Sequence, residues 1–116
     1  MTSTHRRRTN APLPPEQANF AAQTFAALGD RTRARIVYAL TQGEQSVNAL
    51  AEIAGVSASA VSHHLARLRD IRLVKMRRAA NQVFYSVDDV HVANLFREAL
   101  YHLDHIKRQL PDHDQD

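Results

Sequence analysis

The chain has 116 residues, no cysteine and a formal net charge of +3, which fits one mildly basic domain. The absence of cysteine excludes disulfides, thiolate catalysis and thiolate metal sites. No apolar run approaches about 18 residues, and no apolar stretch follows the first arginines, so we expect neither a membrane span nor a secretory signal. These features predict a cytoplasmic protein.

Basic and acidic residues are unevenly distributed. Arginine and lysine are concentrated in residues 1–87, whereas acidic groups gather in Asp88, Asp89, Glu98, Asp104 and the C-terminal tail. A basic region of this extent favours an anionic partner, and nucleic acid is the obvious one.

The first segment, residues 1–15, has no periodicity and contains three prolines, which predicts a disordered basic arm. Its arginines either touch phosphates or are simply solvated. We expect one folded domain over residues 16–110 and an acidic tail over residues 111–116.

Two helices open the predicted domain. The first covers residues 16–28 and ends at Gly29. Asp30 caps the second, over residues 31–41, because a short acidic side chain accepts hydrogen bonds from the first backbone N–H groups of a helix.

The next two helices are joined by a short turn. Ser46 caps a helix that ends before Gly55, and Ser57 caps a helix over residues 58–69. This arrangement is typical of a helix-turn-helix, whose second helix enters the major groove of DNA. That second helix directs Val61, Leu65 and Leu68 to a core. Its polar residues and its N-terminus are predicted to contact DNA through bases and phosphates: Ser57, Ser59, Ser62, His63 and Arg67.

A hairpin follows the recognition helix. Residues 73–78 and 82–87 are β-rich runs separated by A-A-N, with Asn81 expected in the left-handed conformation. Arg77 and Arg78 lie near the tip, so the hairpin is predicted to be a DNA-contacting wing. The alternative is a winged helix that binds protein and never touches DNA.

The stretch from Asp89 to His105 is predicted to be an amphipathic helix, because its apolar residues recur at intervals of three and four. Asp89 and His91 lie at its start, and His102 and His105 at its end. His91 and His102 share a face but are separated by about 16 Å of helix axis. One straight helix therefore cannot bring all four groups to one ion.

Two antiparallel copies of this helix resolve the separation. A two-fold axis brings the front pair of one copy to the rear pair of the other, so each dimer holds two sites. One carboxylate and three imidazoles suit zinc first, with cobalt and nickel as alternatives. The competing interpretation is that Asp89 only caps the helix and the histidines are surface residues.

These motifs resemble the ArsR–SmtB family of metal-sensing winged-helix repressors. The resemblance rests on A-L-G-D-R-T-R-A-R-I, on V-S-A-S-A-V-S-H-H-L-A-R-L-R, and on D-V-H followed by H-L-D-H. It implies a mainly α-helical winged helix-turn-helix with a small β-hairpin, forming a homodimer through the first and last helices. It also implies an intersubunit metal site, in which one subunit provides Asp89 and His91 and the other provides His102 and His105.

The chain departs from the family pattern in several places. The family's second metal site uses cysteines that are absent here, so sensing of arsenic, cadmium or lead through that site is not expected. The wing tip reads A-A-N where glycine is frequent, and His63-His64 stands where His-Gln is common. His5 and His113 lie near the termini, as in the nickel and cobalt members, which recruit extra terminal ligands.

The predicted function is a repressor that binds operator DNA as an apo dimer and is released when zinc or cobalt binds. The alternatives are a nickel or cobalt sensor that also uses His5 and His113, and a metal-insensitive winged-helix regulator. We do not expect an enzyme, because four protein ligands leave no open metal position for a reaction.

Overall fold

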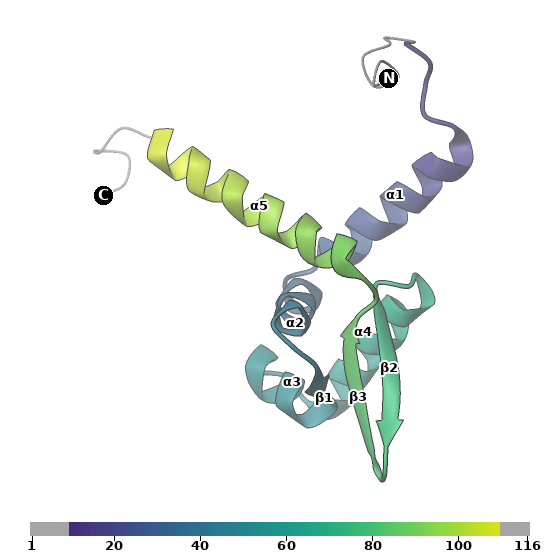
Figure 1. The fold of residues 1–116 in the computed structure, drawn as a ribbon, viewed down its shortest axis with the longest axis vertical. Coiled ribbons are helices and arrows are strands. Elements are labelled where there is room, and N and C mark those ends of the chain that lie inside the picture. The colour runs from purple at the N-terminus through teal and green to yellow at the C-terminus, as the bar shows by residue number, and fades with distance from the viewer. Residues whose placement is uncertain (1–9, 110–116) are drawn as a thin grey trace.

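The computed structural model describes residues 10–109 of the chain (Figure 1). Residues 1–9 of the predicted arm, His5, His113 and the predicted acidic tail lie outside the described residues. The structure is mainly helical with one small sheet, as predicted, and its elements follow in the order α1 (Pro15–Leu28), α2 (Arg31–Thr41), β1 (Gln45–Ser46), α3 (Val47–Ala54), α4 (Ala58–Asp70), β2 (Val74–Ala79), β3 (Gln82–Val87) and α5 (Val90–Gln109).

Helix α1 begins one residue before the predicted start, at Pro15. Proline suits the first helical position because its missing N–H would have no partner there. Helix α2 has the predicted bounds, and the carboxylate of Asp30 accepts a hydrogen bond from the backbone N–H of Arg33 at 2.9 Å. The buried side of α2 includes Ile36 and Val37, neither of which is exposed at all.

The helix-turn-helix is formed by α3 and α4. The Ser46 Oγ accepts from the Ala49 N–H at 3.2 Å, and the Ser57 Oγ accepts from the Ala60 N–H at 3.0 Å. Between the helices Gly55 has a φ of 72°, which closes α3 in the left-handed conformation. Both caps and the turn were predicted and are confirmed.

The hairpin is part of a three-stranded antiparallel sheet of order β1-β3-β2. The short strand β1 was not predicted; it pairs Gln45 with Tyr85. The prediction for Asn81 was wrong, because Ala80 has the positive φ, at 57°. The strands pair up to Ala79 and Gln82, leaving a two-residue turn, and turns of this length favour positive φ at the first position because it matches the strand twist.

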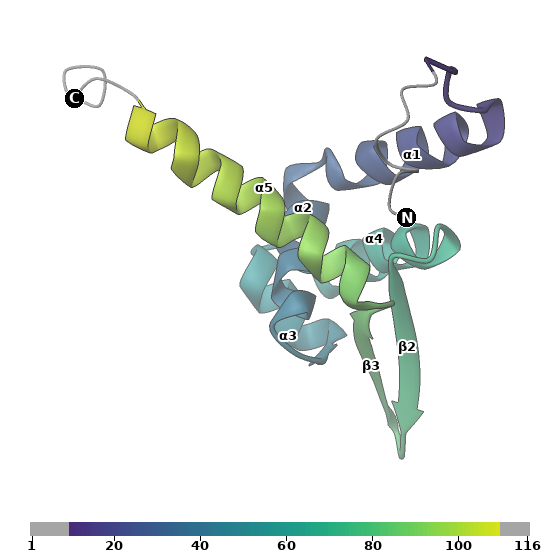
Figure 2. The ribbon, with the colours of Figure 1, turned by 45° about the horizontal axis from the view of Figure 1, so that its top comes forward.

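The core lies between α2, α3, α4 and the base of the hairpin, and its largest fully buried side chains are Ile36, Leu40, Leu50, Leu65, Leu68, Val37 and Val61. Helices α1 and α5 instead extend away from this body in different directions (Figures 1 and 2). Within residues 10–109 no helix is long and apolar enough to cross a membrane.

Candidate nucleic-acid interface and metal centre

Helix α4 has one buried side and one exposed side. Val61, Leu65 and Leu68 are completely buried against the core, which fixes the rotation of the helix about its own axis. The opposite side carries the polar residues predicted to contact DNA, and all of them are exposed: Ser57, Ser59, Ser62, His63 and Arg67. Because Ser57 and the first turn lie at the exposed N-terminus, the free N–H groups of α4 are available to a phosphate.

His64, the neighbour of His63, lies at a junction of three helices. Its Nδ1 is 3.4 Å from Nη1 of Arg33, and the Nε of the same arginine donates to the carbonyl of Ala27 at 2.7 Å. Arg33 therefore connects the end of α1 and the start of α2 to the recognition helix α4. The motif A-L-G-D-R-T-R contains this arginine, but its partner could not be inferred from the sequence.

The Asp30 carboxylate belongs to the same junction. Its pKa is lowered, chiefly because it accepts the hydrogen bond from the Arg33 backbone N–H, and additionally because the charges of Arg33 and His64 favour the ionised form. Desolvation opposes this shift. The cap of α2 is therefore an ionised carboxylate at neutral pH.

The two arginines of the wing differ in their surroundings. The guanidinium of Arg77 donates two hydrogen bonds to the Glu44 carboxylate, at 2.8 Å from Nε and 2.7 Å from Nη2. These bonds lower the pKa of Glu44 and raise that of Arg77. Arg78 is exposed and has no ion pair within residues 10–109. Glu44 was missed by sequence reasoning, because it lies 33 residues from Arg77 with no pattern that links them.

The candidate metal ligands are all exposed on α5 or at its start. Asp89 caps the helix: its Oδ1 accepts from the backbone N–H groups of His91 at 2.9 Å and Val92 at 3.3 Å. His102 and His105 lie near the other end of the 20-residue helix. Within one protomer, the described residues form no group of three or more potential metal ligands. The structure thus does not bring the front pair and the rear pair together in a single copy.

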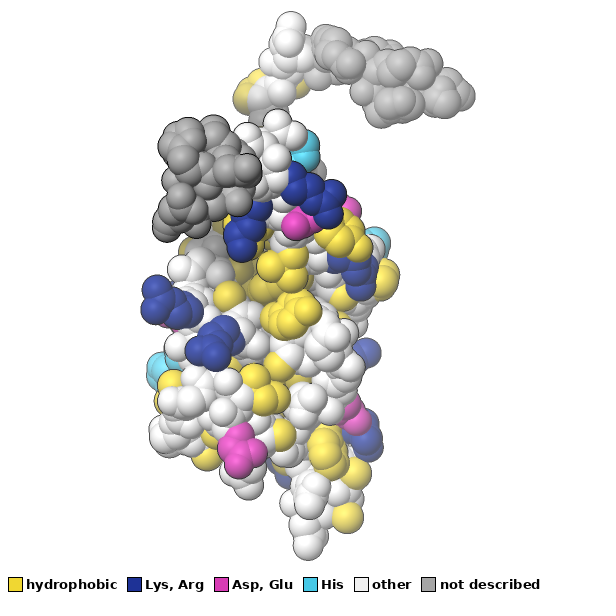
Figure 3. All heavy atoms as spheres, turned by 90° about the vertical axis from the view of Figure 1, so that its left-hand side faces the viewer, with side chains coloured by type: hydrophobic (Ala, Val, Ile, Leu, Met, Phe, Trp, Pro, Cys, Tyr) yellow, Lys and Arg dark blue, Asp and Glu magenta, His cyan; other side chains and the backbone are white. Residues whose placement is uncertain are grey.

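Apolar side chains are exposed along the two projecting helices. Phe20 and Phe25 on α1 are 60% and 62% exposed, and Leu103 and Ile106 on α5 are 49% and 41% exposed. Figure 3, viewed from the side toward which α5 extends in Figure 1, shows hydrophobic side chains on that face with lysine and arginine around them. We call the large exposed apolar residues of α1 and α5 the helix-arm surface, which consists of Phe20, Phe25, Val90, Leu100, Tyr101, Leu103 and Ile106.

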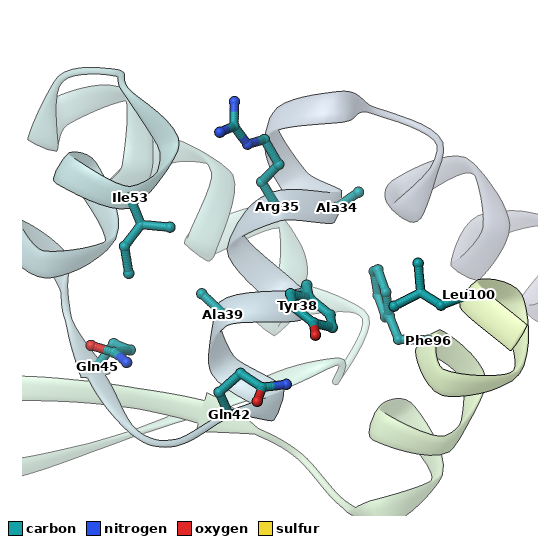
Figure 4. Close-up of a pocket in the computed structure, with 9 residues that line it drawn as sticks. All are labelled: Ala34, Arg35, Tyr38, Ala39, Gln42, Gln45, Ile53, Phe96 and Leu100. Carbon is teal, nitrogen blue, oxygen red and sulfur yellow. The ribbon is translucent and has the colours of Figure 1, made fainter. Parts of the chain in front are cut away.

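A groove of about 650 Å³ lies beside α5, between α2 and α3. The rings of Tyr38 and Phe96 line it with their centroids 6.3 Å apart and their planes tilted by 50°, and Leu100 and Ile53 add apolar lining (Figure 4). The first half of α5 therefore lies against the body, where it contacts α2 and β3, and Leu103 and Ile106 further along are exposed.

Comparisons with known proteins agree with this architecture. The sequence model of a protein family, described as "Bacterial regulatory protein, arsR family", matches residues 30–76. The chain is 42% identical over 107 residues to the HTH-type transcriptional regulator NmtR of Mycobacterium tuberculosis, covering 92% of this chain and 89% of NmtR. It is 39% identical over 102 residues to the HTH-type transcriptional regulator KmtR of the same organism, covering 88% of this chain and 78% of KmtR.

Solved structures give the same result. The solution structure of apo-NmtR superposes with a TM-score of 0.71 at 42% identity, covering 92% of this chain and 90% of that one. A homodimeric winged helix-turn-helix DNA-binding domain from Mycobacterium bovis superposes with a TM-score of 0.75 at 28% identity, covering 87% of this chain and 97% of that one. The chain has the winged helix-turn-helix fold and belongs to the ArsR family of bacterial regulatory proteins.

Proposed function

We propose that this protein is a metal-responsive transcriptional repressor, which binds operator DNA as an apo dimer and is released when zinc or cobalt binds. The observation that carries the proposal is the placement of four candidate ligands, all exposed, at the two ends of one projecting helix with exposed apolar residues. A second copy of the chain can pack on these apolar residues, and its own ligands can complete each half of the metal site.

The helix-arm surface supports the dimer. Phe20 and Phe25 are both more than half exposed, so they leave apolar surface in contact with water. Burying such surface in an interface stabilises the dimer by about 25 cal/mol per Å². The similar structure from Mycobacterium bovis is described as homodimeric, which supports the same assembly here. We therefore place the proposed dimer interface on α1 and α5.

The chemistry of the donor set fits a divalent ion. Carboxylate and imidazole are the ligands that zinc, cobalt and nickel share. The Oδ1 of Asp89 is engaged in capping, but Oδ2 has no hydrogen bond within the described residues, so the same side chain can cap the helix and bind a metal. Asp89 and His91 of one subunit, with His102 and His105 of the other, would hold the ion, whose role is to lock one arrangement of the subunits.

The operator would bind along the exposed side of α4. Small hydroxyl groups at Ser59 and Ser62 permit close approach to base edges, and Arg67 adds positive charge for the phosphate backbone. Release then follows from linkage: metal favours a dimer geometry in which the two copies of α4 fit the operator poorly. The coupling is reciprocal, so operator DNA must weaken metal binding by the same factor by which metal weakens DNA binding. The coupling free energy in such systems is commonly about 1–3 kcal/mol.

The test is fluorescence anisotropy of the apo protein on DNA from its own promoter, titrated with zinc, cobalt and nickel. Zinc or cobalt should release the DNA from the wild type but not from His102→Ala. Glu98→Gln is the matched control, because Glu98 is an exposed acidic residue of the same helix that is not a proposed ligand. It should respond as the wild type does.

Two other results would change the proposal. Release by nickel alone, lost when His5 or His113 is replaced, would indicate a nickel or cobalt sensor that uses terminal ligands. DNA binding that none of the three ions affects would leave a metal-insensitive regulator in which Asp89 only caps α5.

A further inference from the structure

An ion pair connects the wing to the turn between α2 and β1, next to the pairing of β1 with β3. Arg77 of β2 donates its Nε and Nη2 to the two carboxylate oxygens of Glu44, and the closest of these contacts is 2.7 Å. The same guanidinium lies over the ring of Phe84, with 5.2 Å between its central carbon and the ring centroid. A parallel pair of hydrogen bonds and an aromatic face orient this planar guanidinium toward Glu44, with 57% of the Arg77 side chain exposed.

Arg77 and Arg78 point to opposite faces of the hairpin, because successive side chains alternate along a strand. Arg77 is paired with Phe84 across the strands, and Arg78 with Val83. The face of Arg77 is the one that contacts Glu44. Arg78 has no carboxylate partner within the part of the chain that the structure describes.

We propose that Glu44 is a positioning residue, which holds Arg77 of the wing away from DNA. Arg78 is then the wing arginine that contacts phosphate. The inference rests on the DNA-binding part of the proposed function and does not require the metal. It replaces the expectation from the sequence that both arginines contact DNA.

Charge explains why Arg77 stays with Glu44. Moving its guanidinium to a phosphate would break two charge-assisted hydrogen bonds and leave the Glu44 carboxylate unpaired beside a polyanion. Arg78 loses no such partner when it binds phosphate. Of two neighbouring arginines with the same formal charge, the unpaired one is therefore the better phosphate ligand.

Salt dependence separates the two roles, because the slope of log K against log salt counts phosphate contacts at about 0.9 per contact. We would measure this slope by anisotropy with apo protein on promoter DNA. Arg78→Gln should make the slope shallower by about 0.9 for each wing that contacts DNA. Arg77→Gln should leave the slope as it is in the wild type.

Removing the carboxylate tests the restraint itself. Glu44→Ala frees Arg77 and should make the slope steeper by about 0.9 per wing, and adding Arg77→Gln to this variant should restore the wild-type slope. Glu52→Ala is the control, because it removes the same charge from an exposed position of α3 that has no arginine partner within residues 10–109. It can change the affinity through net charge, but it should not change the slope.

NMR of the wild type gives a second readout that needs no substitution. The Nε–H signal of Arg77 should stay unchanged when DNA is added, whereas that of Arg78 should shift. A shallower slope in Arg77→Gln, an unchanged slope in Glu44→Ala, or a DNA-induced shift of the Arg77 signal would each overturn the inference alone. Salt-independent DNA binding, or no binding, by the wild type would overturn the proposed function as well.

Discussion

Asp89 caps α5 and is also a proposed metal ligand, and the substitutions Asp89→Asn and Asp89→Ala separate these two roles. Its Oδ1 accepts hydrogen bonds from the N–H groups of His91 and Val92, and Val92 is a buried residue of the core. Losing such a cap to alanine typically costs about 1 kcal/mol, whereas asparagine caps a helix about as well as aspartate. For a domain of roughly 100 residues, about 1 kcal/mol lowers the melting temperature by about 4–8 °C.

Metal binding should follow a different order from stability. Both substitutions remove a carboxylate ligand, so both should weaken zinc binding. Removing a group that only supports a metal ligand lowers metal affinity by roughly 10–100-fold, and losing the ligand itself should cost at least as much. The assays are thermal unfolding of the metal-free protein at one fixed concentration, and calorimetric titration with zinc. Asp89→Asn should melt like the wild type and bind zinc poorly. Wild-type zinc binding by Asp89→Asn would refute the ligand role and leave only the cap.

Three further predictions concern the body of the protein. Leu65→Ala empties a fully buried position and should lower the free energy of unfolding by about 2–5 kcal/mol in chemical denaturation. His64→Leu removes the acceptor that Arg33 faces and should weaken operator binding in an anisotropy assay, whereas His64→Gln, which keeps an acceptor, should restore it; equal effects would contradict the junction. Because the pKa of Asp30 is lowered in the folded state, its stabilising effect is present above about pH 4 and is lost as the pH falls through the folded value. Denaturation of Asp30→Asn should therefore show a smaller loss of stability over that acidic range, and an unchanged loss would contradict this assignment.

Much of the fold could be predicted because its signals are local. Asp30, Ser46 and Ser57 each precede a helix that the structure begins at the next residue, since a cap acts on backbone N–H groups only three residues away. The buried side of α4 follows in the same way from the spacing of Val61, Leu65 and Leu68.

The features that were missed depend on contacts between distant parts of the chain. Strand β1 has two residues, too few for a periodicity, and exists only because β3 pairs with it. Glu44 acts on the wing through a single ion pair across the fold. The left-handed turn residue was assigned to Asn81 from its intrinsic preference, but the strand register places the positive φ at Ala80.

The metal site remains a prediction for a related reason. Its two halves lie on one helix, and the proposed contact between them is made by a second copy of the chain. The sequence indicates both halves through the spacing of Asp89, His91, His102 and His105, while the protomer shows only that each half is exposed and that they stay apart.

Mixed dimers test the intersubunit site most directly. His91→Ala and His102→Ala homodimers should each have no intact site, because every site lacks one ligand. A heterodimer of the two variants has one doubly altered site and one site whose ligands are all present. We would titrate the two variants and their refolded mixture with cobalt and follow the absorption of the bound ion. The account predicts that the mixture regains about half a site per dimer on statistical pairing, since half of the dimers are mixed. Cobalt binding that mixing does not restore would contradict the shared site.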